Sequence, residues 1–340
     1  MSAGEVDDFR KILLLNSPPI RTISGFWRRF AAFGIDCLLL GIIGSALGIF
    51  FSDFFQQLGI WGTVLGFAIA LPYFGLLNSS IGNGQTLGKR LMHIRVVDRD
   101  GQTISLRISL IRYSILATLW FLNIGMLPAS FGASWFGMEV GAFLSGVQLS
   151  VAYLYVFNRQ TRQSLHDFMV GTYVVESVPN GRVEAPPVWK GHGYVMVPVV
   201  VTLLVIIPLN AFRIMHSGPF LELMVIGQAV QKMDNVGAAS VFQIGRLGTN
   251  ISMPLTVTVN WKRRPQNEEM EATKVAAQVL AADPQAANRR SLVIRTVNGY
   301  TIGIASAFRS RNFEYAPEQW REKIRLVSPN QGAVAPWQRK

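Results

Sequence analysis

Residues 30–51 read FAAFGIDCLLLGIIGSALGIFF, an apolar stretch in which Asp36 is the one charged residue. A helix needs about 20 predominantly apolar residues to cross the hydrocarbon core of a bilayer. The stretch meets this requirement, and it is longer than the apolar part of a secretory signal. We therefore expect it to remain in the protein as a membrane-spanning helix.

Four further apolar stretches are candidates for membrane spans. They cover residues 58–77, 113–127, 140–157 and 194–212. The third reaches back toward Ser105 only by including Arg107 and Arg112, so it either crosses the bilayer or lies along its interface. With this span counted, the sequence predicts an α-helical polytopic membrane protein with about five transmembrane helices.

The composition agrees with a membrane protein and excludes several other classes. Of 340 residues, 50% are hydrophobic and 15% are charged, whereas soluble domains carry about 25% charged residues. Disordered and collagen-like chains are excluded, and the single cysteine, Cys37, cannot form an internal disulfide. A net charge of +12 would indicate nucleic acid for a soluble protein. Here we expect no nucleic-acid partner, because membrane proteins distribute Lys and Arg unevenly across the bilayer.

The basic residues alternate from loop to loop. Lys and Arg are frequent before the first span, between the second and third, and between the fourth and fifth, and they are absent from residues 52–57 and 128–139. Since cytoplasmic loops carry the excess of Lys and Arg, the pattern places the N-terminus in the cytoplasm and the C-terminal region outside it. If the third span lies along the interface instead, the C-terminal region would be cytoplasmic.

These boundaries divide the chain into five parts. They are a cytoplasmic N-terminal segment (1–25), a membrane domain with four transmembrane helices (26–176), a cytoplasmic linker (177–193), the fifth transmembrane helix (194–212) and a soluble domain (213–340). The linker is assigned because residues 178–187 are rich in Pro and Gly.

Short β-prone runs lie in the predicted cytoplasmic loops. Residues 93–98 alternate in polarity, and Asp100 with Gly101 offers a tight turn into residues 102–106. This predicts a small cytoplasmic β-hairpin, which residues 172–176 can join as a further strand.

The soluble region alternates helical and β-prone runs. Helices are predicted at 220–233, from Pro265 onward and at 317–326, and strands at 240–245, 255–261, 292–297 and 300–308. Asn298 and Gly299 are a strong signal for a two-residue turn between the last two strands. This order predicts a C-terminal extracytoplasmic α+β domain.

Glycines form a stripe along the first span. Gly34, Gly41 and Gly48 recur every seven residues on one helix face, and Gly44 and Gly48 match the GxxxG spacing. Gly62 and Gly66 repeat that spacing at the start of the second span. Small residues let helix backbones approach closely, so the stripe predicts helix–helix packing.

Asp36 is the most informative residue of the sequence. It lies ten residues beyond Phe26, which places it about 15 Å into the helix, close to the middle of the bilayer. A carboxylate at that depth is unfavourable unless it is protonated, paired or hydrated. Two roles are open: a structural ion pair between helices, and a site for an ion or a proton.

Two arginines are candidates for the same site. Arg112 lies about 10 Å into the third span and is nearest in depth to Asp36, so we expect a buried Asp36–Arg112 ion pair. Arg29 precedes Asp36 by seven residues on the same helix face. We expect Arg29 to anchor the helix by extending to the lipid phosphates.

Other motifs give weaker signals for chemistry. The run GQTLGK at 84–89 is similar to a phosphate-binding loop, but its spacing fails and Arg90 stands where Ser or Thr is required. We expect Asp167 to cap a short helix or to pair with Arg90 or Arg162. One His beside one Asp is too little for a metal site, and no catalytic arrangement is apparent, so we expect no metal, no cofactor and no enzymatic activity.

Four segments together resemble the RDD family of membrane proteins. They are RRFAAFGID at 28–36, GQTLGKR at 84–90, VVDRDG at 96–101 and HDFMVGTYVV at 166–175. The resemblance covers roughly residues 24–176. It implies that Arg29, Asp36 and Asp167 correspond to the arginine and the two aspartates for which the family is named, and that the protein is a membrane protein for which transport of unidentified ligands is suggested.

Two functions follow as hypotheses. The first is a secondary transporter or exchanger of small cations and protons in a bacterial inner membrane, with Asp36 as the coupling carboxylate and Arg112 tuning its affinity. The alternative is a membrane-anchored assembly, sensing or scaffold protein whose residues 213–340 bind an envelope partner. Besides the lipid bilayer, a homo-oligomeric partner would add polar groups to the membrane region.

Overall fold

The computed structural model describes residues 21–121, 134–177, 181–243, 254–283, 285 and 289–327. Most of the predicted N-terminal segment and half of the predicted loop at 128–139 lie outside this part. The chain forms two compact units: the first holds residues up to 41 and from 67 to 208, and the second holds residues 42–66 and those from 209 on. The division falls inside one long helix, so residues 42–66 group with the C-terminal region, which the sequence did not predict.

Three stretches of the described residues are long and apolar enough to cross a membrane. They are Phe26–Leu77, Trp135–Phe157 and Gly191–Met215. The first contains both initial predicted spans, as α2 (Phe26–Leu58), the short η1 (Gly59–Trp61) and α3 (Gly62–Leu77). The second is α7 (Trp135–Phe157), and the third is α9 (Gly191–Val201), a π-helical segment η3 (Thr202–Ile206) and α10 (Ile207–Met215).

The predicted third span corresponds in part to α5 (Leu106–Phe121), a helix of 16 residues. Its length is below the roughly 20 residues that a perpendicular span requires, and the rest of the predicted span, residues 122–127, lies outside the described residues. The described residues therefore contain three candidate membrane spans, whereas the total number of spans belongs to the proposals below.

Large apolar side chains of α2 point away from the protein. Trp27, Ile49 and Phe50 are 76%, 79% and 78% exposed. A soluble protein would bury most of these groups, whereas a helix in contact with lipid exposes them. Trp27 near the start of the helix also matches the Trp residues that are enriched at membrane interfaces.

A two-stranded sheet ties distant loops of the first unit together. Strand β1 (Ile94–Val97) pairs antiparallel with β2 (Tyr173–Glu176), with Ile94 opposite Glu176. The turn at Gly101 forms, since Asp98 N–H donates to the carbonyl of Gln102 at 2.9 Å. The predicted hairpin partner is nevertheless wrong: residues 102–105 form no strand and lead directly into α5. The predicted additional run, 172–176, is the actual partner of β1.

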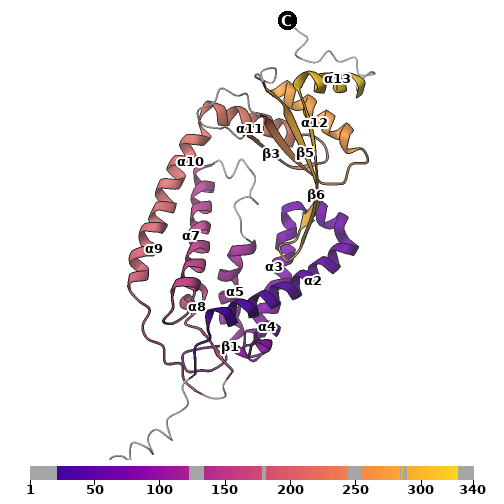
Figure 1. Ribbon diagram of the computed structural model, residues 1–340. Helices are drawn as coiled ribbons and strands as arrows, with labels where there is room; N and C mark the ends of the chain where they lie inside the picture. Colours follow the sequence, from indigo (N-terminus) through magenta and orange to yellow (C-terminus); the bar gives the residue numbers. More distant parts are fainter. Residues whose placement is uncertain are drawn as a thin grey trace, which may run out of the picture. The chain divides into compact units, whose positions relative to one another are not determined.

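The C-terminal region is an α+β fold of helices around a four-stranded sheet (Figure 1). Its strands lie in the order β3-β4-β5-β6, and only β4 and β5 are parallel, because α12 connects them. The core includes Val257, Ile294, Val275 and Trp320. The elements are α11 (Gly218–Gln231), β3 (Val236–Gln243), β4 (Leu255–Trp261), α12 (Glu268–Ala282), β5 (Leu292–Thr301), β6 (Ser306–Tyr315) and α13 (Pro317–Val327).

The predicted turn at Asn298 and Gly299 is wrong. Strand β5 continues through both residues, and Asn298 lies opposite Arg309 in β6. The chain turns at residues 302–305, where Ile302 N–H donates to the carbonyl of Ala305 at 2.9 Å. The hairpin is longer than predicted because Tyr300 and Ile302 are buried in an apolar cluster with Phe55 of α2.

Three of the glycines predicted to pack helices instead contact this hairpin. A Cβ atom on Gly44 would lie 2.8 Å from the Cβ of Ala305. A Cβ on Gly48 would overlap the Tyr300 hydroxyl, and one on Gly62 would overlap the carbonyl oxygen of Thr301. The absence of side chains at these positions therefore admits a β-hairpin against the helix.

Candidate functional site

The short helix α8 (Leu165–Val170) carries Asp167, one of the candidate site residues. Ser164 stands at its N-cap, and its hydroxyl donates to the carbonyl of Val151 in α7 at 2.7 Å. Gly171 ends the helix with φ +67°, a backbone conformation that glycine adopts without strain. Held at both ends, α8 directs His166 and Asp167 into the first unit, where they are 3% and 0% exposed.

Asp167 forms two buried ion pairs. Its Oδ1 accepts from Nε and Nη2 of Arg112 at 2.9 and 2.6 Å, and its Oδ2 accepts from Nη2 of Arg29 at 2.6 Å. The Thr172 hydroxyl donates to Oδ1 at 3.2 Å. The Arg29 and Arg112 side chains are 7% and 5% exposed. One carboxylate therefore connects α2, α5 and α8.

The electrostatics of this cluster favour an ionised aspartate. Burial alone would raise the pKa of Asp167, but Arg112 and Arg29 hold it well below its usual range. Burial lowers the pKa of His166 to about 3, against the attraction of Asp167, so the imidazole is neutral at physiological pH. The cluster thus sets two positive guanidinium groups against one negative charge.

Asp36 forms a second site, with neutral donors. Its Oδ1 accepts from the Tyr73 hydroxyl at 2.7 Å and from the backbone N–H of Gly88 at 2.8 Å. Its Oδ2 accepts from the Thr86 hydroxyl at 2.5 Å. Asp36 is 1% exposed. All three donors come from α3 or from the segment that follows it, which folds back onto α2.

The GQTLGKR segment supplies two of these donors through its local structure. Thr86 is the N-cap of α4 (Leu87–Leu91) and accepts from Lys89 N–H at 3.3 Å. Gly88 lies so close to α2 that a Cβ would overlap the carbonyl oxygen of Ala32. Glycine at this position therefore lets the backbone of α4 reach the Asp36 carboxylate.

Lys89 lies beside this site without forming an ion pair in the described residues. Its ammonium donates to Oδ1 of Asn78 at 2.6 Å. Burial, together with Arg112 and Arg29, lowers its pKa to about 7 against the opposing effect of Asp36 and Asp167. Lys89 is thus a group that exchanges a proton near neutral pH.

Three predicted contacts of the site are wrong. Within the described residues, no ion pair joins Asp36 to Arg112: Arg112 pairs with Asp167, because α8 brings that carboxylate to it. Arg29 is not the free, exposed anchor that was predicted, since its side chain is 7% exposed and pairs with the same carboxylate. Asp167 pairs with neither Arg90 nor Arg162, and Arg162 contributes only its carbonyl, which accepts from Arg29.

Sequence reasoning missed Tyr73, Thr86, Gly88, Lys89 and Asn78. A usable signal was present for Thr86, because Thr before a short run of helix-forming residues is a typical N-cap. Within the described ranges, no group of three or more His, Cys, Asp or Glu residues is placed to hold a metal ion.

Comparison with known proteins supports the membrane part of the chain. The model of the RDD family matches residues 23–171, a range that contains Arg29, Asp36, Arg112 and Asp167. The chain is similar to the uncharacterized protein YckC of Bacillus subtilis (strain 168), with 26% identity over 160 residues, 46% of this chain and 86% of that protein. No solved structure gives a significant match. The resemblance to the RDD family is thus confirmed for these residues.

Proposed function

We propose that this RDD-type membrane protein exchanges small cations for protons, with Asp36 as the carboxylate that binds either one. The observation that carries the proposal is the environment of Asp36, which is 1% exposed in an apolar helix and receives hydrogen bonds from three neutral groups. A carboxylate withdrawn from water without a counter-cation is stabilised when it takes up a proton or a metal cation.

The surroundings of Asp36 favour this role over a purely structural one. Arg29 and Arg112 are both occupied by Asp167, so the structural ion pair of the unit does not use Asp36. The hydroxyl oxygens of Tyr73 and Thr86 lie against the carboxylate, and hard cations bind oxygen ligands of this kind. Lys89, with its lowered pKa, adds a second group that can pass a proton.

The proposal includes the topology of the chain. We propose five spans in a bacterial inner membrane, with the N-terminus in the cytoplasm and residues 213–340 outside. Support comes from the alternation of basic loops. Helix α5 would be one of these five spans.

Proton movement in sealed vesicles tests the exchange. Purified wild-type protein and Asp36→Asn are reconstituted with a pH-sensitive dye inside, and pulses of sodium, potassium or lithium are added outside. We expect each effective cation to move protons in the wild type and not in Asp36→Asn. Asp53→Asn is the matched control, because Asp53 lies on the same helix and is exposed.

The outcome can refute the proposal. All proteins must first elute as single species and unfold at comparable temperatures. Equal proton movement in the wild type and in folded Asp36→Asn would exclude Asp36 as the coupling group. Tyr73→Phe removes one donor to the carboxylate and should change the cation concentration for half-maximal movement; an unchanged value would remove this hydroxyl from the site.

A second candidate is a membrane-anchored scaffold whose C-terminal domain binds an acidic envelope partner. It rests on β6, which forms an edge of the sheet and exposes Arg309 and Arg311. An exposed edge strand is a surface on which another chain can pair. Charge reversal at both arginines should abolish crosslinking to that partner in cells, whereas reversal of Arg321 and Arg325 on α13 should not. Equal crosslinking in both variants would exclude the β6 edge.

A further inference from the structure

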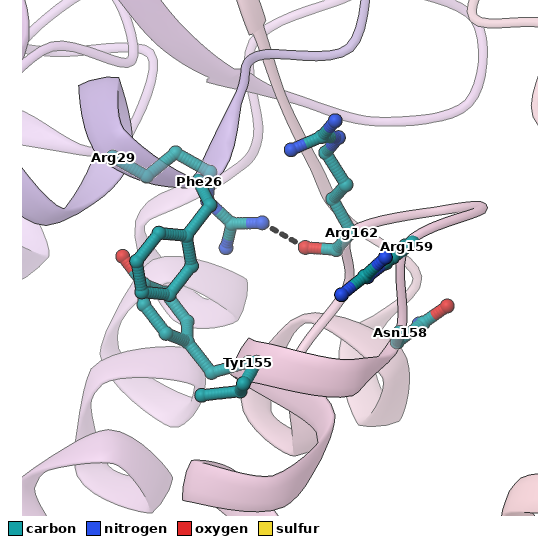
Figure 2. A pocket seen from close by; sticks show the side chains of 7 residues that line it. Phe26, Arg29, Tyr155, Asn158, Arg159 and Arg162 are labelled. Carbon is teal, nitrogen blue, oxygen red and sulfur yellow. Dashed lines mark hydrogen bonds between the residues drawn. The ribbon is translucent and has the colours of Figure 1, made fainter.

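A basic pocket lies where α2 begins and α7 ends (Figure 2). Its volume is about 390 Å³, within the range of roughly 300–1,000 Å³ that is usual for small-molecule sites. Phe26 and Arg29 line it from the first turns of α2, and Tyr155, Arg159 and Arg162 line it from α7 and the following loop. All of these residues belong to the first unit.

The loop that carries two of the arginines is held in place by buried hydrogen bonds. Asn158, which is 2% exposed, donates from Nδ2 to the Thr161 hydroxyl at 2.7 Å and to the carbonyl of Gln163 at 2.9 Å. Arg162 has φ +53°, a conformation that is unfavourable for a residue with a side chain. The buried hydrogen bonds therefore hold the loop in shape, including Arg162 in its unfavourable conformation. The arginines of the loop are thus positioned before a ligand binds.

The pocket carries positive charge that the described residues do not neutralise. Arg29 shares the single carboxylate of Asp167 with Arg112. Among the ion pairs of the described part of the chain, none involves Arg159 or Arg162. Three arginines thus line one hollow, and the one carboxylate paired with any of them, that of Asp167, is shared with Arg112. Guanidinium groups match the geometry of phosphate oxygens.

Apolar groups surround the pocket on the side of the helices. The Phe26 and Tyr155 rings lie 5.2 Å apart between centroids and form one wall. Next to them, Trp27, Phe30 and Val156 are 76%, 54% and 50% exposed. A ligand that enters the hollow with an anionic group can therefore place an acyl chain along exposed apolar side chains of the same two helices.

We propose that this pocket binds a phosphate group, supplied either by an anionic phospholipid or by a free phosphate. The site is separate from the proposed cation exchange, because neither Asp36 nor the three residues that donate to it line the pocket. Basic pockets between membrane helices are known to hold anionic headgroups.

Binding of labelled lipid to the full-length protein tests the proposal. The probe is phosphatidylglycerol with a fluorophore on its acyl chain, titrated with protein in a neutral detergent and followed by anisotropy. Since each basic residue near a membrane surface contributes about fivefold in affinity, Arg159→Gln with Arg162→Gln should weaken binding about 30-fold. Arg159→Gln alone, a change in an exposed side chain, should weaken it about fivefold and keeps the test valid if the double variant does not fold.

Controls separate charge from site, and lipid from free phosphate. Arg99→Gln with Arg107→Gln removes the same charge from exposed positions outside the pocket and should leave the affinity unchanged. Displacement of the lipid by millimolar inorganic phosphate would show that the pocket recognises phosphate alone; failure to displace it would show that the acyl chain contributes. Equal binding of labelled diacylglycerol, which has no phosphate, or equal phosphatidylglycerol binding in the wild type and the folded Arg159→Gln variant, would overturn the proposal.

Discussion

Asp167→Asn removes the one negative charge that the buried cluster contains. Asparagine is nearly the same size and keeps one oxygen acceptor, so the packing of α8 is preserved while the ion pairs are lost. Arg29 and Arg112, 7% and 5% exposed, are then left without a counter-charge. Breaking a buried ion pair by removing one partner costs about 3–5 kcal/mol, because an uncompensated charge remains away from water.

This free energy translates into a measurable change in unfolding temperature. For a unit of about 150–250 residues, 1 kcal/mol corresponds to about 2–4 °C in Tm, so we expect Asp167→Asn to lower Tm by about 6–20 °C. The assay is thermal unfolding of the purified protein in detergent, followed by circular dichroism. Because Arg112 and Arg29 hold the pKa of Asp167 low, the carboxylate stays ionised in the folded protein, and the difference from the wild type should persist from pH 7 down to about pH 4, the usual pKa of the unfolded chain.

A matched control is available in the same unit. Asp100 pairs with Arg182 at 3.1 Å, but their side chains are 69% and 70% exposed. Exposed pairs contribute about 0–1 kcal/mol, so Asp100→Asn should change Tm by less than about 4 °C. Equal shifts for the two variants would refute the reasoning. Adding Arg112→Gln to Asp167→Asn should recover part of the loss, since it removes one unpaired charge.

Three further substitutions test other features. In the wild type, the unfolding free energy should rise between about pH 7 and pH 10 by at most about 1.4 kcal/mol per pH unit, because the unfolded chain keeps a proton that folded Lys89 has lost. Lys89→Met should abolish this rise in denaturant titrations. The same slope in both proteins would contradict the lowered pKa of Lys89. Gly88→Ala should lower the unfolding free energy by about 1–3 kcal/mol, because its Cβ overlaps the α2 backbone. The control Gly34→Ala should not lower it, because its Cβ has no neighbour within 4 Å. A similar Tm for the two variants would argue against close packing of α4 on α2. Gly62→Ala overlaps the carbonyl of Thr301 and should increase hydrogen exchange in the β5–β6 turn, and unchanged exchange would show that the helix does not hold the hairpin.

Local patterns predicted the elements better than their partners. Strand β4 was predicted with its actual bounds, 255–261, because its alternating apolar residues face one core. The predicted end of α13 differs from the observed end by one residue. The turn at Asn298 failed because a tertiary contact outweighed a local preference: burying Tyr300 and Ile302 against Phe55 favours a longer hairpin than the turn signal indicates.

The site shows the same limit. Counting residues along the helices predicted Asp36 and Arg112 at a similar depth in the membrane. This count does not show which sides of the two helices are in contact. The partner of Arg112 comes from α8, and two of the three donors to Asp36 come from a segment that folds back after α3. Neither contact follows from spacing, although both lie in segments that the RDD resemblance had already marked.

The Asp167 cluster also sets an order of events during synthesis of the chain. Arg29 and Arg112 precede Asp167 by 138 and 55 residues. At roughly 5–20 residues per second, the ribosome needs about 3–11 s to extend from the second arginine to the aspartate. During that interval both guanidinium groups lack their counter-charge, so they remain stable only in contact with water or lipid headgroups. The ion pairs that join α2 and α5 to α8 can therefore form only after Asp167 has been synthesised, so the packing of these helices is completed late.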